Sequence, residues 1–118
     1  MDINDFAKLV HGLACDNGWH DEKDDEKFFQ IACNNLHNEV SELHEAWRNG
    51  ALDDLCDKAD GMRAIGLRPL TCREEELADI VIRVLDNMQR FGLDPAEVLQ
   101  ITHQYNCSRP YRHGGKKG

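Results

Sequence analysis

Residues 71–92, TCREEELADIVIRVLDNMQRFG, contain the start signal, the apolar stripe and the stop signal of one amphipathic helix. Thr71 and Glu74 match the Ser/Thr-x-x-Glu capping box, in which each side chain bonds the backbone N–H of the other residue. Gly92 follows the last apolar position and supplies the stop. The apolar positions recur at helical spacing and are Leu77, Ile80, Val81, Val84, Met88 and Phe91.

The rest of the chain repeats this pattern. The longest predicted helix starts after Asp24 or Asp25 as N-cap, stops at Gly50 and measures roughly 35 Å. Its stripe is Phe29, Ala32, Leu36, Val40, Leu43 and Trp47. A first helix ends near Gly18, a short one is expected over 52–58, a loop over 59–70, and a last helix after Asp94-Pro95. Strand-like alternation is absent beyond a few residues, so we expect an all-α, four-helix-bundle-like protomer.

Two acidic motifs lie on the two strongest helices. They are Glu39-Val-Ser-Glu42 and Glu76-Leu-Ala-Asp79. Residues at i and i+3 project from one helix face, so each motif offers two carboxylates side by side. If the helices pack together, four carboxylates converge and each raises the pKa of its neighbours. A divalent cation relieves this repulsion, and all-oxygen ligation favours Mg²⁺ or Mn²⁺ over zinc.

The position of the motifs on the helical wheel separates a metal site from an ordinary acidic surface, because 22 acidic residues produce other i, i+3 pairs as well. Both acidic rows border the apolar stripe and do not lie opposite it. The rows are Asn35, Glu39, Glu42 and Ala46 on one helix, and Glu76, Asp79, Arg83 and Asp86 on the other. A solvated acidic rim is the alternative. A di-iron bundle is disfavoured, since no histidine follows a glutamate by three residues.

Composition limits the other function classes. The chain has 118 residues, 41% of them hydrophobic, which is one domain with enough apolar surface for a core. A net charge of −8 argues against general affinity for nucleic acid or anionic membranes. Without a membrane-length apolar run or a basic, signal-like start, we expect a cytoplasmic protein. The five cysteines are widely spaced, which is typical of free thiols.

The acidic motifs and their surroundings resemble the MazG-like, all-α nucleoside triphosphate pyrophosphohydrolases. That family has Glu-x-x-Glu, then Glu-x-x-Asp, then Asn or Asp seven residues later, here Asp86. The segment Gly18-Trp19-His20-Asp21 and the tail Tyr105-Asn106, Arg109-Pro110 and His113-Gly114-Gly115-Lys116 are similar to small phage-type and bacterial members. The resemblance runs from about residue 18 to the end. We therefore expect a catalytic domain over 1–108 and a basic tail over 109–118. The 33 residues between Glu42 and Glu76 exceed the usual family spacing.

The resemblance implies cleavage of a (d)NTP between the α- and β-phosphates, releasing (d)NMP and pyrophosphate. Magnesium, or manganese, would be held by Glu39, Glu42, Glu76 and Asp79, and would neutralise the triphosphate and lower the pKa of a bound water. Glu42 or Glu45 would accept the proton of that water. The substrate-binding residues implied are Trp19, Arg83, Asp86, Arg109 and Lys116.

Several of these roles have alternatives at the level of sequence. Arg83 can instead form a salt bridge within its acidic row, and Trp19 can be an ordinary core or interface residue. The basic tail can close over the phosphates or be disordered. A homodimer or homotetramer is expected, because long amphipathic helices leave apolar surface uncovered. The alternative functions are a non-catalytic acidic helical module of antitoxin type, and a metal-binding bundle without hydrolase activity.

Overall fold

The computed structural model describes residues 1–110, and residues 111–118, including Lys116, lie outside that part. The described chain is all-α and contains five helices and no β-strand. The helices are α1 (Ile3–Asp16), α2 (Asp25–Arg48), α3 (Ala59–Ala64), α4 (Cys72–Arg90) and α5 (Pro95–Cys107). No helix in this part is both long enough and apolar enough to cross a membrane.

Helix boundaries follow the capping signals in the sequence. Thr71 and Glu74 form both halves of the predicted capping box at the start of α4. Asp24 and Asp94 accept hydrogen bonds from the third residue of α2 and α5, which satisfies an N–H without an intrahelical partner. Gly92 adopts a φ of 69° after α4, a left-handed conformation that favours glycine and lets the chain leave the helix.

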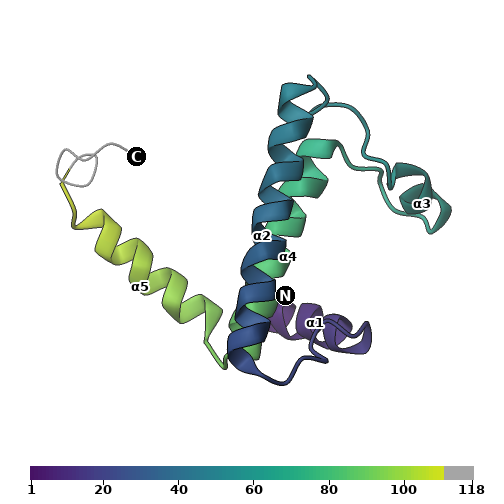
Figure 1. Ribbon diagram of the computed structural model, residues 1–118. Helices are drawn as coiled ribbons and strands as arrows, with labels where there is room; N and C mark the ends of the chain where they lie inside the picture. Colours follow the sequence, from purple (N-terminus) through teal and green to yellow (C-terminus); the bar gives the residue numbers. More distant parts are fainter. Residues whose placement is uncertain (111–118) are drawn as a thin grey trace.

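The fold is organised around an antiparallel pair, α2 and α4, shown in Figure 1. Helix α1 packs across the lower end of this pair and contacts α4. Helix α5 begins at the same end and projects away from the pair. Its start is tied to α1 by Asn4, whose side chain donates to Asp94 at 2.8 Å and accepts from the Ala96 N–H at 2.9 Å. In the described chain, α1, α2 and α4 thus form a three-helix assembly, and α5 projects from it.

The contact between α2 and α4 lies closer to the polar edge of each helix than the sequence pattern predicts. Buried positions include Phe28 and Ala32 on α2, and Leu85 and Asp86 on α4. The predicted stripe is half solvent-exposed instead, with Trp47 62% exposed and Val81 53% exposed. Periodicity in the sequence identifies the apolar face of a helix. The positions of the neighbouring helices decide which part of the helix surface is buried.

The connection between α2 and α4 differs from the prediction. The short helix expected over 52–58 is wrong, and so is the uninterrupted loop over 59–70, because the helix forms at α3. Residues 52–56 instead bond to the segment that begins α4. The Cys72 N–H donates to the Asp54 carbonyl and the Arg73 N–H to the Leu52 carbonyl, each at 2.8 Å. These backbone bonds hold the connection against the upper end of α4.

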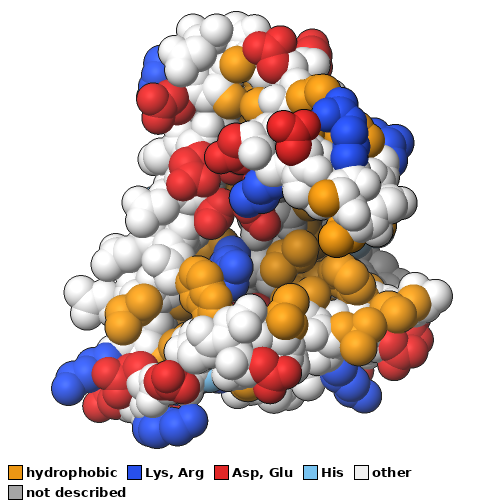
Figure 2. All heavy atoms as spheres, turned by 90° about the vertical axis from the view of Figure 1, so that its right-hand side faces the viewer, with side chains coloured by type: hydrophobic (Ala, Val, Ile, Leu, Met, Phe, Trp, Pro, Cys, Tyr) orange, Lys and Arg blue, Asp and Glu red, His pale blue; other side chains and the backbone are white. Residues whose placement is uncertain are grey.

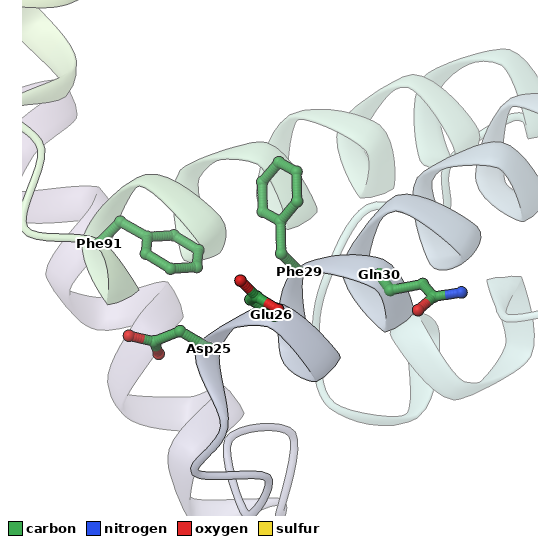
Figure 3. A pocket seen from close by; sticks show the side chains of 5 residues that line it. All are labelled: Asp25, Glu26, Phe29, Gln30 and Phe91. Atoms are coloured by element: carbon green, nitrogen blue, oxygen red, sulfur yellow. The ribbon is translucent and has the colours of Figure 1, made fainter.

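An apolar hollow of about 500 Å³ lies at the lower end of the α2–α4 pair. Figure 3 shows the side chains that line it, with Phe29 of α2 and Phe91 after α4 next to each other, and Asp25, Glu26 and Gln30 near them. The two phenyl rings meet edge to face, with centroids 5.8 Å apart. This hollow is part of the exposed apolar surface and contains none of the predicted metal ligands.

Candidate functional site

Three of the four predicted metal ligands meet between α2 and α4. Carboxylate oxygens of Glu39, Glu76 and Asp79 all lie within 4.8 Å of one another. Glu76 and Asp79 share a face of α4 because they are three residues apart, and the antiparallel packing brings Glu39 of α2 opposite them. We call these three residues the acidic cluster. Figure 2 shows carboxylates gathered over the upper part of this side of the molecule, with basic side chains among them and hydrophobic side chains below.

The acidic cluster carries more negative charge than the nearby cations Lys58 and Arg83 offset. Burial raises the pKa of Glu76, and the charges of Glu75, Glu42, Glu39 and Asp79 raise it too, so that together they bring it to about 7. Burial also raises the pKa of Glu39, together with the charges of Asp79 and Glu42, against a smaller opposing effect of Arg83 and Lys58.

Two oxygens of the acidic cluster have no hydrogen-bond partner. Glu39 Oε2 and Glu76 Oε2 are both buried and unpaired among the described residues. A buried acceptor without a donor is costly, and the cost is larger for a charged group. The donor set is all oxygen and contains three carboxylates, which is the chemistry that Mg²⁺ and Mn²⁺ prefer. The residues present therefore fit a hard divalent cation.

The two predicted proton acceptors are both exposed. Glu42 lies close enough to raise the pKa of Glu39 and of Glu76. It is not one of the three residues whose oxygens converge within 4.8 Å. Glu45 lies a further turn along α2, and no effect of its charge on either glutamate is resolved. Glu42 thus borders the acidic cluster on its solvent side.

Lys58 and Glu75 belong to the site and were missed by the sequence analysis. Glu75 is buried, and the Lys58 ammonium donates to its carboxylate and, at 3.5 Å, to Asp79. The hydrogen bond to Glu75 is the main cause of a raised Lys58 pKa. Lys58 reaches the cluster from the connection just before α3, and no local motif signals that approach. Glu75 adjoins Glu76 in the sequence, but its burial is set by tertiary packing that no local pattern signals.

Arg83 and Trp19 lie next to each other beside the acidic cluster. Arg83 is one turn after Asp79 on α4, and its guanidinium carbon is 3.8 Å from the centre of the Trp19 ring. Arg83 Nε is buried without a partner in the described chain. Both residues border a groove of about 290 Å³ between α1 and α4. The apolar lining of this groove includes Phe6, Leu13 and Ile82.

Asp86 lies two turns beyond Asp79 and is separate from the acidic cluster. It is buried, and one of its oxygens accepts from His11 Nδ1 at 2.8 Å and from His20 Nε2 at 2.7 Å. The structure thus places this predicted substrate residue among histidines. Sequence analysis missed both, because His11 lies on α1 and His20 follows it, far from α4 in the chain.

The predicted residues of the tail are only partly described. Arg109 follows α5, where its guanidinium lies 5.8 Å from the Tyr105 ring and its backbone N–H bonds the Asn106 carbonyl. These contacts are within the projecting end of the chain, away from the α2–α4 pair (Figure 1). Lys116 lies outside the described residues.

Comparisons of the chain with protein-family models, with curated proteins and with solved structures give no match. Functional inference therefore depends on the site itself.

Proposed function

We propose that this protein is a magnesium-dependent nucleoside triphosphate pyrophosphohydrolase of MazG-like type, which converts a (d)NTP to (d)NMP and pyrophosphate. The proposal rests on the acidic cluster, in which three carboxylates converge and two buried oxygens have no hydrogen-bond partner within residues 1–110. Such a set of hard donors has an unmet requirement for positive charge. It lies between two helices that carry Glu-x-x-Glu and Glu-x-x-Asp in the order of the family's motif.

Glu39, Glu76 and Asp79 would hold the metal, with Glu42 completing the set or acting beside it. Bound magnesium would supply positive charge against the phosphates and make a nearby water more acidic. Glu42 is the better of the two predicted proton acceptors, because it borders the cluster and faces solvent. Lys58 would contribute a second positive charge on the same side.

The groove beside the cluster suits the remainder of a nucleotide. Arg83 lies between the carboxylates and Trp19, so that its guanidinium can turn from the indole to a phosphate. The indole and the apolar walls of the groove would then face the base. The metal ligands and Arg83 would thus face the phosphates and the indole would face the base, in the order in which these groups follow one another in the substrate.

We further propose that the active form is a homo-oligomer. Large side chains on α2 and α4 are exposed along one edge, including Val40, Trp47, Leu77 and Val81. Exposed apolar surface of this extent is typical of a protein interface. A second copy would present the same apolar edge, which suits the self-complementary contact of a two-fold dimer and would complete a bundle of four helices.

The same exposed surface favours one alternative, a non-catalytic helical interaction module. The two functions differ in turnover. Purified protein should release pyrophosphate from at least one member of a (d)NTP panel with Mg²⁺ and none with a chelator.

Glu76→Gln should abolish this release, whereas Glu26→Gln, at an exposed acid on the first turn of α2, should leave it intact. Release of inorganic phosphate in place of pyrophosphate would assign a different cleavage position. An inactive wild-type protein across the whole panel would favour the interaction module.

A further inference from the structure

A second set of metal-ligating side chains lies below the acidic cluster and has a different chemistry. Donor atoms of His11, Cys15 and His20 all lie within 4.8 Å of one another. His11 and Cys15 are four residues apart and share one face of α1, and His20 arrives from the turn that follows this helix. Nitrogen and sulfur donors of this kind suit zinc, whereas the oxygens of the acidic cluster suit magnesium.

The hydrogen bonds orient His11 as they would a metal ligand. Its Nδ1 donates to the buried carboxylate of Asp86, so its Nε2 presents a lone pair. That lone pair accepts from the Cys15 thiol, with Nε2 and Sγ 3.4 Å apart. In a tetrahedral zinc site, bonds of about 2.0–2.1 Å to nitrogen and 2.3 Å to sulfur separate the two donors by about 3.6 Å. The observed spacing differs from this value by a few tenths of an ångström.

Asp86 gives the site a feature common among metal-binding histidines. Its Oδ1 also accepts from His20 Nε2 at 2.7 Å, so one buried carboxylate fixes both imidazoles. Ligating histidines usually donate their other ring N–H to such a carboxylate, which sets the tautomer and makes the ligand more basic. With Cys15 as a thiolate, Asp86 and Cys15 together would offset the charge of a dication.

Metal binding by His20 would require Arg90 to give up one hydrogen bond. It donates to His20 Nδ1 at 3.3 Å, the nitrogen with which His20 would bind a metal while keeping its bond to Asp86. The guanidinium has stronger contacts without this one. It donates to the Glu22 carbonyl at 2.7 Å and lies 3.7 Å from the Phe28 ring centre. Loss of the hydrogen bond to His20 would therefore leave Arg90 in place through its contacts with Glu22 and Phe28.

A second His–Cys pair, on α5, serves as a comparison for this cluster. His103 and Cys107 on α5 have the same spacing, with Nε2 and Sγ 3.7 Å apart. Within residues 1–110, however, no third ligand of the His, Cys or carboxylate type joins this pair. A two-ligand site on an exposed helix binds zinc far more weakly than a three-ligand site.

We propose that His11, Cys15 and His20 bind Zn²⁺, with Asp86 holding the two imidazoles in place. The ion would clamp α1 and the turn after it onto α4, since Asp86 belongs to α4. This site is independent of the proposed hydrolase activity, because it shares no ligand with the acidic cluster.

Cobalt(II) gives the most direct test, since a thiolate ligand produces a charge-transfer band in the near ultraviolet and tetrahedral coordination produces intense visible bands. Tag-free protein, reduced and anaerobic, should develop both at one equivalent of Co²⁺, and Zn²⁺ should abolish them. Cys15→Ser should remove the charge-transfer band, whereas Cys107→Ser should retain it. His11→Ala and His103→Ala should differ in the same way.

Competition for Zn²⁺ between the protein and a chromophoric chelator measures the zinc affinity of each variant. Cys15→Ser should weaken zinc binding at least roughly 100-fold, and Asp86→Asn roughly 10–100-fold. Glu76→Gln should leave the zinc affinity unchanged, so failure of the hydrolase proposal and failure of this one are separable. The proposal is overturned if wild-type protein gives no charge-transfer band, or if Cys15→Ser keeps the band of the wild type.

Discussion

Glu76 and Asp86 are carboxylates on one face of α4, yet they lie in opposite electrostatic situations. Glu76 is partly buried among other acids, so its pKa rises to about 7, and one of its buried oxygens has no partner in the part of the chain that the structure describes. Asp86 is buried more deeply and accepts from two imidazoles. One helix thus carries a carboxylate among other acids and a carboxylate that accepts from two imidazoles. Residue type alone does not distinguish these two situations, because both side chains are carboxylates.

The difference comes from the elements that meet each end of α4. Its upper end contacts the acidic stretch of α2, and the connection brings Lys58 to Glu75 and Asp79 as a counter-charge. Its lower end contacts α1 and the turn after it, which bring His11 and His20. If Glu76 has the metal-binding role that we propose, substitutions at Glu76 and at Asp86 should have effects of opposite kind.

The largest expected effect is on catalysis. Glu76→Gln keeps the size of the side chain but removes a charge from the acidic cluster, so pyrophosphate release should fall at least about 10³-fold, equivalent to about 4 kcal/mol. The same substitution should leave the metal-free protein as stable as the wild type or more so, because it relieves repulsion. Steady-state kinetics and urea unfolding check the two halves, and a clear loss of stability would contradict the comparison.

The second effect concerns Asp86. Asp86→Ala leaves His11 and His20 without their acceptor in a buried setting and should lower the free energy of unfolding by about 3 kcal/mol. Asp86→Asn should cost less, because the amide oxygen still accepts. Urea unfolding of these variants beside Glu76→Ala gives the contrast directly. Equal losses at the two positions would show that both carboxylates are structural.

The third effect is the pH dependence of stability without metal. Glu76 has a folded-state pKa of about 7 against an ordinary value of 4.5. Between these values the folded protein binds more protons than the unfolded chain, so stability should fall as the pH rises, by at most about 1.4 kcal/mol per pH unit. Below this window Glu76 is protonated in both states and the penalty is absent.

Magnesium should oppose this trend, since it binds the ionised carboxylates and its affinity rises with pH. Thermal melts from pH 4 to 8 with and without Mg²⁺ provide the measurement, and Glu76→Gln serves as the control. The slope between pH 4.5 and 7 should flatten in that variant. A slope that persists there would assign the titration to another group.

The smallest effect concerns Lys58, which is the internal cation of the acidic cluster. Its side chain is 59% exposed, so its ion pairs contribute modestly, and Lys58→Met should lower the stability of the metal-free protein by about 0.5–1 kcal/mol. The rise in melting temperature on adding Mg²⁺ should increase, because the metal then neutralises more charge. Lys27→Met, at an exposed position of α2, should change neither quantity.

Local features of this fold follow from sequence, and the remaining features depend on tertiary contacts. The Thr71–Glu74 capping box and the Asp94-Pro95 start are set by neighbours a few residues away, so their positions are readable in advance. Convergence of Glu39 on Glu76 and Asp79 was also predictable, because periodicity places each on the edge of a packing face. The approach of Lys58 to the acidic cluster and the contact between His11 and Asp86 were not predictable. Each brings together segments that are far apart in the sequence and share no local pattern.

The exposure of α5 has a consequence for its backbone. Of its 13 residues only Pro95 is buried and only Val98 is half-buried, while its remaining residues face solvent. Isolated helices of this length are marginal in water. Amide hydrogens of α5 should therefore exchange with solvent much faster than those of α4, at rates close to those of an unstructured peptide. Any increase in their protection with protein concentration would report the free energy of association.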